Sequence, residues 1–177
     1  MEIKILKVGK LRCNCYVLVN EDNALVIDPG DDTEEIIKLI GDMNVSGVIV
    51  THHHFDHDTG VDKIIDEYGC MMYDRYNLDE GINEIDNFKF EVIYTPGHKE
   101  DLITIYFKED KVMFCGDFIF KDSIGRCDLP GSSIPDMVKS LDKIKKYDRD
   151  ITIYPGHGIK TILGYEIENN VYFREFV

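Results

Sequence analysis

The stretch Thr51-His52-His53-His54-Phe55-Asp56-His57 holds four of the six histidines of this chain. The other two end Pro-Gly-His triplets, at Pro96-Gly97-His98 and Pro155-Gly156-His157. Histidines used for packing or surface polarity would be scattered, whereas these lie in short clusters with Asp and Gly. Neutral imidazole is the commonest protein ligand for zinc-like ions. The pattern therefore indicates a metal site.

Each of these motifs, and one aspartate, follows a short apolar run that favours a β-strand. The runs are residues 47–50 before the histidine cluster, 90–94 before His98, 111–115 before Gly116-Asp117, and 151–154 before His157. Strand ends are rigid, and the loops leaving them can converge on one point. We therefore expect the side chains that follow these runs to lie close together.

The remaining elements predict a mixed α/β chain without an internal linker. Strands are expected at residues 2–8, 15–19 and 24–27, and Asp28-Pro29-Gly30 ends the third. A helix follows, for which Asp32 and Glu35 suit a capping box. Further helices are expected at residues 59–68, at 134–147 behind a Ser132-Ser133 cap, and for at least one turn within 161–177. The length of 177 residues predicts a single domain over 1–177.

Composition excludes several classes of function. The net charge of −14 argues against a general affinity for nucleic acid, whose phosphates would be repelled. No secretory signal opens the sequence, and no stretch approaches the ~18 apolar residues of a membrane span. The five cysteines lack metal-finger spacing, which favours reduced thiols. We expect a cytoplasmic monomer or homodimer that acts on a small molecule.

The spacing of the histidines suggests two groups of ligands. If residues 51–55 are extended, successive side chains alternate, so His52 and His54 face one way and His53 faces the other. The suggested ligands are His52, His54 and His98 for one metal, Asp56, His57 and His157 for a second, and Asp117 as a bridge. Asp117 alone would also suit a helix cap or turn. Asp28 suits a turn or a role in orienting a ligand.

Two such metals predict hydrolysis. A pair of divalent ions about 3.5–4 Å apart can share a water and lower its pKa to near 7, which yields a nucleophile at neutral pH. The carboxylates of Asp56 and Asp117 are expected to serve catalysis as well as metal binding. Zinc is the expected metal, although His/Asp sites also accept iron and manganese.

The order of these motifs resembles the metallo-β-lactamase-fold hydrolases. The matching pattern is Thr51-His-x-His-x-Asp-His57, followed by His98, Asp117 and His157. The resemblance extends over nearly the whole chain, because Asn14-Cys15-Tyr16, Ile27-Asp28-Pro29-Gly30 and Glu168-Asn169-Asn170 also match family landmarks. It implies a four-layer αβ/βα sandwich, of the α/β (α+β) class, with metals at one edge. It also supports the suggested ligands.

Two stretches are similar to the glyoxalase II-like branch of that family. They are residues 51–57, with their triple histidine, and residues 116–120 running into 123–131. This branch includes hydroxyacylglutathione hydrolases, so the implied reaction is hydrolysis of a thioester such as S-lactoylglutathione by a metal-bound hydroxide. Arg126 lies in the stretch that matches the substrate loop of the branch and can pair with a substrate carboxylate. Lys99 and Lys160, beside ligand histidines, are weaker candidates for the same role.

The chain also departs from the branch. It ends soon after its last ligand motif, which predicts a short form without the C-terminal helical domain. The residues after His98 are Lys99-Glu100-Asp101-Leu102, where the family often has Thr-Pro-Gly-Ser. Three alternatives stay open: a persulfide dioxygenase-like iron oxidoreductase, a phosphodiesterase or nuclease of the same fold, and a metal-binding protein without enzymatic activity. The acidic charge weighs against the nuclease.

Overall fold

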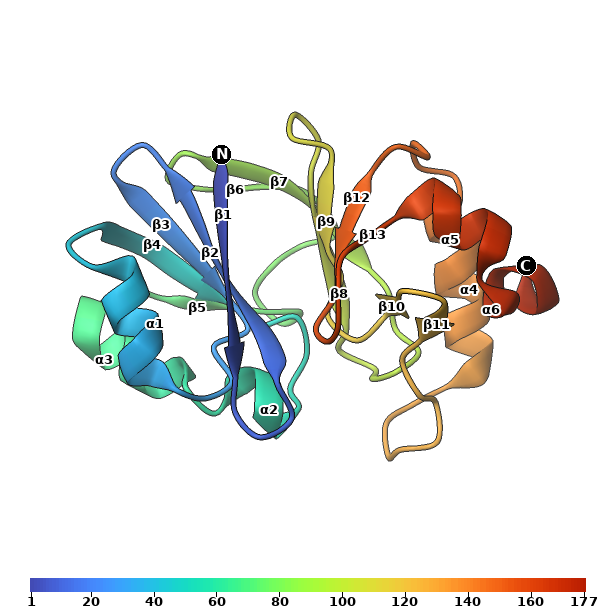
Figure 1. Ribbon diagram of the computed structural model, residues 1–177, viewed down its shortest axis with the longest axis horizontal. Helices are drawn as coiled ribbons and strands as arrows, with labels where there is room; N and C mark the ends of the chain where they lie inside the picture. Colours follow the sequence, from blue (N-terminus) through green and yellow to red (C-terminus); the bar gives the residue numbers. More distant parts are fainter.

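Two β-sheets face each other across an apolar core in the computed structural model, which describes all of residues 1–177 (Figure 1). The strands of the first sheet, in spatial order, are β1 (Glu2–Val8), β2 (Cys13–Asn20), β3 (Asn23–Ile27), β4 (Asn44–Ile49) and β5 (Met72–Tyr73). Those of the second are β13 (Thr161–Ile162), β12 (Thr152–Tyr154), β9 (Val112–Phe114), β8 (Ile103–Phe107), β7 (Phe88–Tyr94) and β6 (Gly81–Ile85). A small ribbon joins β10 (Ile119–Phe120) to β11 (Ser123–Ile124).

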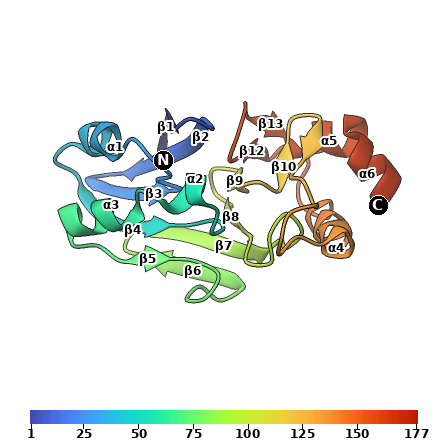
Figure 2. The same cartoon turned by 90° about the horizontal axis from the view of Figure 1, so that it is seen from below.

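Helices cover the outer face of each sheet (Figures 1 and 2). On the first sheet they are α1 (Thr33–Ile40) and α3 (Val61–Tyr68), and on the second α4 (Ile134–Ile144), α5 (Leu163–Asn169) and α6 (Val171–Phe176). The short α2 (Phe55–Asp58) lies at one edge. The order of layers is thus helix, sheet, sheet, helix, and the expected αβ/βα sandwich is confirmed.

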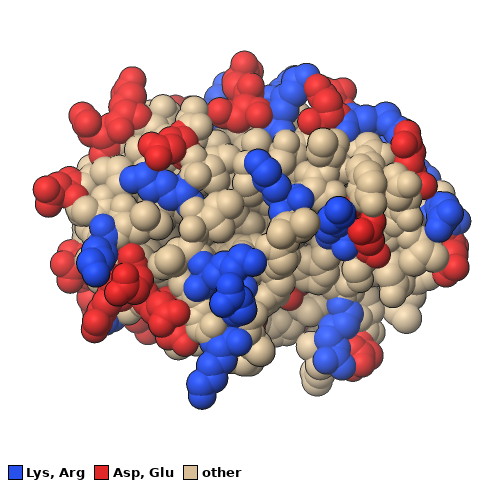
Figure 3. Space-filling model, in the orientation of Figure 1, with Lys and Arg blue, Asp and Glu red and all other residues tan.

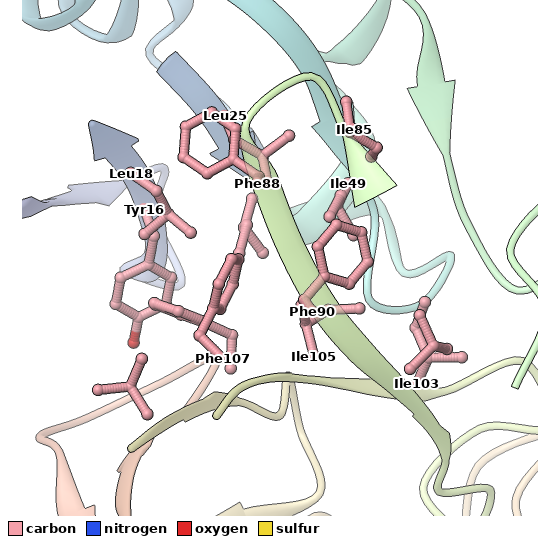
Figure 4. Close-up of a cluster of buried hydrophobic side chains, with 14 of the residues drawn as sticks. Tyr16, Leu18, Leu25, Ile49, Ile85, Phe88, Phe90, Ile103, Ile105 and Phe107 are labelled. Atoms are coloured by element: carbon pink, nitrogen blue, oxygen red, sulfur yellow. The ribbon is translucent and has the colours of Figure 1, made fainter. Parts of the chain in front are cut away.

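The core between the sheets forms because several strands are apolar on the face that they turn inward. Figure 4 shows side chains from both sheets meeting there: Tyr16, Leu18, Leu25 and Ile49 from the first sheet, and Ile85, Phe88, Phe90, Ile103, Ile105 and Phe107 from the second. All five residues of β8 are buried, which fits a central strand covered on both faces. Burial of this apolar surface holds the two sheets at a fixed separation.

The strands that precede the expected ligands are confirmed, with small shifts at their ends. The structure adds β5, β6, β8, β10, β11 and β13, which the sequence did not predict. The helix expected at residues 59–68 is α3, which begins two residues later, and the separate short helix α2 precedes it. The Ser133 hydroxyl caps α4 by accepting a hydrogen bond from the Asp136 N–H.

The capping box expected at Asp32 is wrong. Asp32 has a left-handed backbone with φ of 48°, and its side chain makes no cap hydrogen bond to α1. Its carboxylate instead accepts a hydrogen bond from the Gly9 N–H, at 2.8 Å, in the turn between β1 and β2. A tertiary contact has therefore replaced the local one. None of the helices is long and apolar enough to cross a membrane.

Phe114 of β9 offers a test of the core between the sheets. Its side chain is fully buried, and its ring lies 4.9 Å from that of Tyr16 and 5.2 Å from that of Tyr154, measured between centroids. We expect Phe114→Ala to lower the free energy of unfolding by about 3–5 kcal/mol in urea denaturation, because it leaves a cavity in a packed core. Ile82→Ala, on an exposed side chain of β6, should change it by less than about 0.5 kcal/mol. A loss below about 1 kcal/mol for Phe114→Ala would contradict this account of the core.

Candidate metal centre

Four loops that leave strand ends meet at one edge of the molecule, between the two sheets (Figures 1 and 2). They follow β4, β7, β9 and β12, as the sequence predicted. Main-chain hydrogen bonds tie these loops together. The Ile103 N–H donates to the Thr51 carbonyl at 2.9 Å, and the Gly156 N–H donates to the Gly116 carbonyl at 2.8 Å. The side chains on the four loops are therefore held in fixed relative positions.

Three histidines form the first group of expected ligands. His54 Nδ1 lies 3.1 Å from His52 Nε2 and 3.0 Å from His98 Nε2. His52 and His98 are buried, whereas His54 is partly exposed at the mouth of the site. The three ring nitrogens lie within 4.8 Å of one another, which is close enough to share one ion. The alternation inferred for residues 52–54 is confirmed.

The second group lies directly beside the first. Asp56 Oδ2 is 3.0 Å from His157 Nε2 and 3.8 Å from His57 Nε2. The carboxylate of Asp117 lies between the groups: Oδ1 is 3.4 Å from His57 Nε2, and Oδ2 is 3.6 Å from His98 Nε2 and 3.7 Å from His157 Nε2. Asp117 thus has the position of a bridge, and the seven expected ligands come together in one place.

Each ligand histidine has one ring nitrogen that faces away from the site. Where that nitrogen makes a hydrogen bond, the bond determines whether the other nitrogen presents a lone pair to the site. His98 Nδ1 donates to the Arg126 carbonyl at 2.8 Å, and His157 Nδ1 donates to the Leu11 carbonyl at 3.1 Å. A carbonyl only accepts, so the Nδ1 atom carries the proton and Nε2 presents a lone pair to the site. This arrangement is the one that metal-binding histidines commonly have.

The buried carboxylate of Asp28 orients two more of the histidines, His57 and His52. His57 Nδ1 donates to Asp28 Oδ2 at 2.9 Å, which leaves a lone pair on His57 Nε2. The Thr51 hydroxyl donates to the same carboxylate at 2.7 Å. Its oxygen is therefore free to accept from His52 Nδ1 at 3.2 Å, so His52 Nε2 also presents a lone pair inward. Asp28 combines the two roles that the sequence left open, because it also makes the turn after β3, with φ of 52°.

The residues at the site fit bound cations. Lone pairs that face one another at about 3 Å repel unless a positive charge lies between them. His57 Nε2 and Asp117 Oδ1 are both buried and have no hydrogen-bond partner, which is costly for polar atoms without an ion. Gly156 leaves this place clear: a Cβ there would overlap Asp117 Oδ1 and lie 2.6 Å from His57 Cε1.

The pKa values at the site follow from burial and from these pairs. Burial, reinforced by the neighbouring His57, holds the pKa of His52 well below its usual range. Burial alone would lower the pKa of His57, but the charge of Asp28, the hydrogen bond to Asp28 and the carboxylate of Asp117 at 3.4 Å raise it well above the usual range. The hydrogen bond that His157 donates to Asp56 raises the pKa of His157. Protons and cations therefore compete for His57 and His157.

Cys13 lies close to His57 but on its outer side. Its Sγ atom is 3.5 Å from His57 Nδ1, the nitrogen that bonds Asp28, and not from the Nε2 atom that faces Asp117. Burial raises the pKa of the Cys13 thiol to about 11. A neutral thiol in this position is a packing neighbour of a ligand and not a ligand itself.

Comparison with known proteins places this geometry in a family. The model of the metallo-beta-lactamase superfamily matches residues 8–71 and 74–157, which include all seven expected ligands. The chain belongs to the metallo-beta-lactamase superfamily. Members are metal-dependent hydrolases, so the expected family, fold and metal-dependent character of the site are confirmed.

Three individual proteins are similar to this chain over nearly its full length. The chain is 29% identical to hydroxyacylglutathione hydrolase GloC of Haemophilus influenzae, over 96% of this chain and 97% of that protein. It is similar in structure to BLEG-1 B3 metallo-beta-lactamase, with a TM-score of 0.93 and 28% identity over 97% of this chain and 99% of that one. It is also similar to TTHA1623 in a di-iron-bound form, with a TM-score of 0.88 and 26% identity over 96% and 99% of the two chains.

The superfamily site is braced by groups that the sequence did not predict. The triple histidine is held through its middle residue, because His53 places its ring nitrogens 2.9 Å from Asp58 and 3.0 Å from Asp74. The His53 N–H also donates to the buried carboxylate of Asp101 at 3.1 Å. The carbonyls of Leu11 and Arg126 orient ligands, as described above. No residue type marks a main-chain carbonyl that orients a ligand, so the roles of these two carbonyls could not be predicted from the sequence.

The two residues expected to bind substrate, Lys99 and Arg126, lie at the edge of the site, which we call the rim. Lys99 Nζ is 3.2 Å from both oxygens of Asp101, so it is held next to the loop that carries His98. Arg126 is exposed and forms a two-pronged pair with Asp128, with distances of 2.6 and 2.7 Å. The charge of Lys99 acts on His52 and His54, whereas Arg126 contacts the site only through its main-chain carbonyl. Both side chains already have a carboxylate partner.

Gly156 provides a test of the second group of ligands. We expect Gly156→Ala to weaken binding of the second metal by at least about 100-fold, because the added Cβ occupies space against Asp117 and His57. Calorimetric titration of the metal-free protein with zinc measures the affinity of the second site. Gly69→Ala is the matched control: it strains a left-handed residue at the end of α3, where a Cβ meets nothing, and should leave two metals bound. Two tight sites in Gly156→Ala would contradict the assignment.

Acidification should weaken metal binding. His57 and His157 have raised pKa values, so both hold protons that a cation must displace. The metal association constant should fall by up to about tenfold per pH unit for each displaced proton as the pH drops from about 8 to about 6. The metal-free fold has the opposite dependence: protonation of His57 stabilises it at low pH, and that stability is lost as the pH rises through the raised pKa. A pH-independent metal affinity would show that these histidines are not ligands.

Proposed function

We propose that the chain is a thioester hydrolase with a dinuclear metal site, acting on S-lactoylglutathione or a related small acyl thioester. The observation that carries this proposal is the position of Asp117 between two complete groups of ligands, which matches a two-metal hydrolytic site. The similarity to hydroxyacylglutathione hydrolase GloC over nearly the full length of both chains supports the choice of a thioester.

Two divalent cations held by these residues would supply the Lewis acidity and the lowered water pKa that hydrolysis at neutral pH requires. The chain supplies placement and charge. Burial alone would raise the pKa of Asp117, but the imidazole of His57, 3.4 Å away, lowers it, so this carboxylate is ionised. Asp117 and Asp56 are the carboxylates among the seven ligands, and they are the groups positioned to take the proton of the attacking water. The departing thiol, with a pKa near 8.5, leaves without an acid catalyst.

The rim favours a substrate with an anionic end. Lys99 and Arg126 lie beside the loop of His98, and we assign them the role of pairing with a carboxylate of the thiol portion. Such a carboxylate would compete with Asp128 for the planar fork of Arg126. Figure 3 shows further Lys and Arg side chains on the lower edge of this face, over the end of the β1–β2 hairpin, while acidic side chains predominate at its left.

Zinc is our proposed metal. All seven ligand atoms are imidazole nitrogens or carboxylate oxygens, a set that also suits iron and manganese. The di-iron form of TTHA1623, at 26% identity, is a specific reason to keep an iron enzyme as the second candidate. Metal analysis of the purified protein distinguishes zinc from iron, and oxygen uptake with a persulfide substrate distinguishes an oxidoreductase from a hydrolase.

His54→Ala is the direct test of the proposed function. His54 Nδ1 lies within 3.1 Å of both other histidines of its group, so its loss opens the first metal position. We expect bound metal to fall from two ions per chain toward one and kcat/KM for S-lactoylglutathione to fall by at least about 100-fold. Metal content by emission spectroscopy and thiol release by a colorimetric assay give the two readouts.

Ile82→Ala is the control, since this side chain is 66% exposed on the edge strand β6, away from the four loops that carry the ligands. It should retain two ions per chain. Unchanged thioester turnover in His54→Ala, or a wild-type protein that binds two metals and hydrolyses no thioester, would refute the proposal.

A further inference from the structure

The carboxylate of Glu166, in α5, is fully buried and takes no part in the metal centre. Three donors use its oxygens. Oε1 accepts from the Thr161 hydroxyl, and Oε2 accepts from the Asp122 N–H and from Asn170 Nδ2, each at 2.9 Å. A buried carboxylate is costly unless its lone pairs are used, so these bonds fix the segments that donate them. One of those segments is the turn between β10 and β11, at Asp122.

Two further hydrogen bonds join the same turn to α5 and to the residue that follows α5. Asn170 Nδ2 donates to the Ser123 carbonyl at 2.9 Å, and the Tyr165 hydroxyl donates to Asp122 Oδ1 at 2.8 Å. The turn is thus bonded through the main chain of both of its residues and through one side chain. We call Glu166, Asn170 and Tyr165 the α5 clamp.

The ribbon of β10 and β11 connects two parts of the metal centre. Its first strand follows the bridge Asp117, and its second strand leads to Arg126, whose carbonyl accepts from His98 Nδ1 at 2.8 Å. Gly125 lies where the ribbon closes, and its N–H donates to the Phe118 carbonyl at 3.1 Å. A Cβ on Gly125 would overlap the Asp117 carbonyl and lie 2.9 Å from His98 Cβ. The end of the ribbon is therefore packed against two of the ligands.

The second strand of the ribbon has few other contacts that could hold it. The ribbon consists of two residue pairs, Ile119 with Ile124 and Phe120 with Ser123, and a ribbon of this length is not stable alone. Burial of Ile119 anchors the first strand, whereas Ser123 and Ile124 of the second strand are only half-buried. The position of the second strand therefore depends on the α5 clamp.

We propose that Glu166 is a positioning residue for His98, acting through the second strand of the ribbon and the Arg126 carbonyl. The α5 clamp holds that carbonyl where it accepts the Nδ1 proton of His98, so that Nε2 presents a lone pair to the first metal. Without the clamp the carbonyl is free to move, and the imidazole loses the bond that selects its tautomer. This inference rests on the metal centre of the proposed function and not on the choice of a thioester substrate.

The first experiment measures amide hydrogen exchange in the metal-free protein by NMR. The Gly125 N–H is the reporter, because no substitution used here removes its hydrogen-bond partner. Glu166→Leu should speed its exchange by at least about tenfold. The Ile103 N–H, which bonds across the two sheets, should keep its rate and is the internal reference. Glu166→Gln should restore the protection of Gly125, because its amide oxygen can accept both bonds of Oε2 while the Thr161 hydroxyl accepts from its NH₂ group. Equal loss in both Glu166 variants would overturn this account of the bonds.

Tyr165→Phe tests the α5 clamp without altering the core, so it decides the question even where Glu166→Leu fails to fold. It removes only the hydroxyl of a 40% exposed side chain. Exchange of the Gly125 N–H should become about two- to fivefold faster, as expected for one lost hydrogen bond. Tyr172→Phe is the matched control, because its hydroxyl, on α6, makes no hydrogen bond within the protein. Equal exchange rates in these two variants would overturn the α5 clamp.

The second experiment asks whether the α5 clamp reaches His98. Imidazole ¹⁵N NMR of the metal-free protein should show the Nδ1–H tautomer of His98 in the wild type and in Glu166→Gln, and a mixture of tautomers in Glu166→Leu. In calorimetric titration with zinc, the association constant of the first metal should fall by about tenfold in Glu166→Leu and stay within about twofold of wild type in Glu166→Gln. Faster Gly125 exchange with an unchanged His98 tautomer and zinc affinity would overturn the positioning role. The expected tautomers and affinities without any thioester turnover would support this inference and refute only the proposed reaction.

Discussion

The buried carboxylate of Asp28 is the interaction on which the rest of the site depends. It accepts hydrogen bonds from the Thr51 N–H and hydroxyl, both at 2.7 Å, and from His57 Nδ1 at 2.9 Å. A buried carboxylate is costly unless its lone pairs are used, and here three donors use them. The same bonds fix His57 directly and His52 through Thr51. One side chain at the end of β3 thereby orients a ligand in each of the two groups.

The stacking of the sheets explains why ligands so far apart in sequence can share ions. The first sheet supplies residues 52–57, and the second supplies His98, Asp117 and His157. Main-chain bonds cross between the halves next to the metal site, from Ile103 to Thr51 and from Asn14 to Gly156. Because the apolar core sets the separation of the sheets, its packing also sets the distance between the two groups of ligands. Substitutions in the core can therefore change metal binding without touching a ligand.

The features that could be predicted from the sequence are those that depend on residues close together in the chain. Side-chain alternation in an extended segment separates His53 from His52 and His54, and four apolar runs located the strands that lead to the ligands. Other features depend on tertiary contacts. Asp32 has the residue type of a helix cap but bonds Gly9, and the carbonyls of Leu11 and Arg126 have no sequence signature.

The charge of the chain and the charge of its site have opposite signs, and distance decides which one a substrate meets. The net charge of −14 acts at long range but is screened beyond about 8 Å in physiological salt. Among the seven ligands only Asp56 and Asp117 are anionic, so two divalent cations would leave the pocket positive. An anionic substrate that reaches the mouth would therefore be attracted by two bound cations, and the charge of Lys99, which acts on His52 and His54, would add to that attraction.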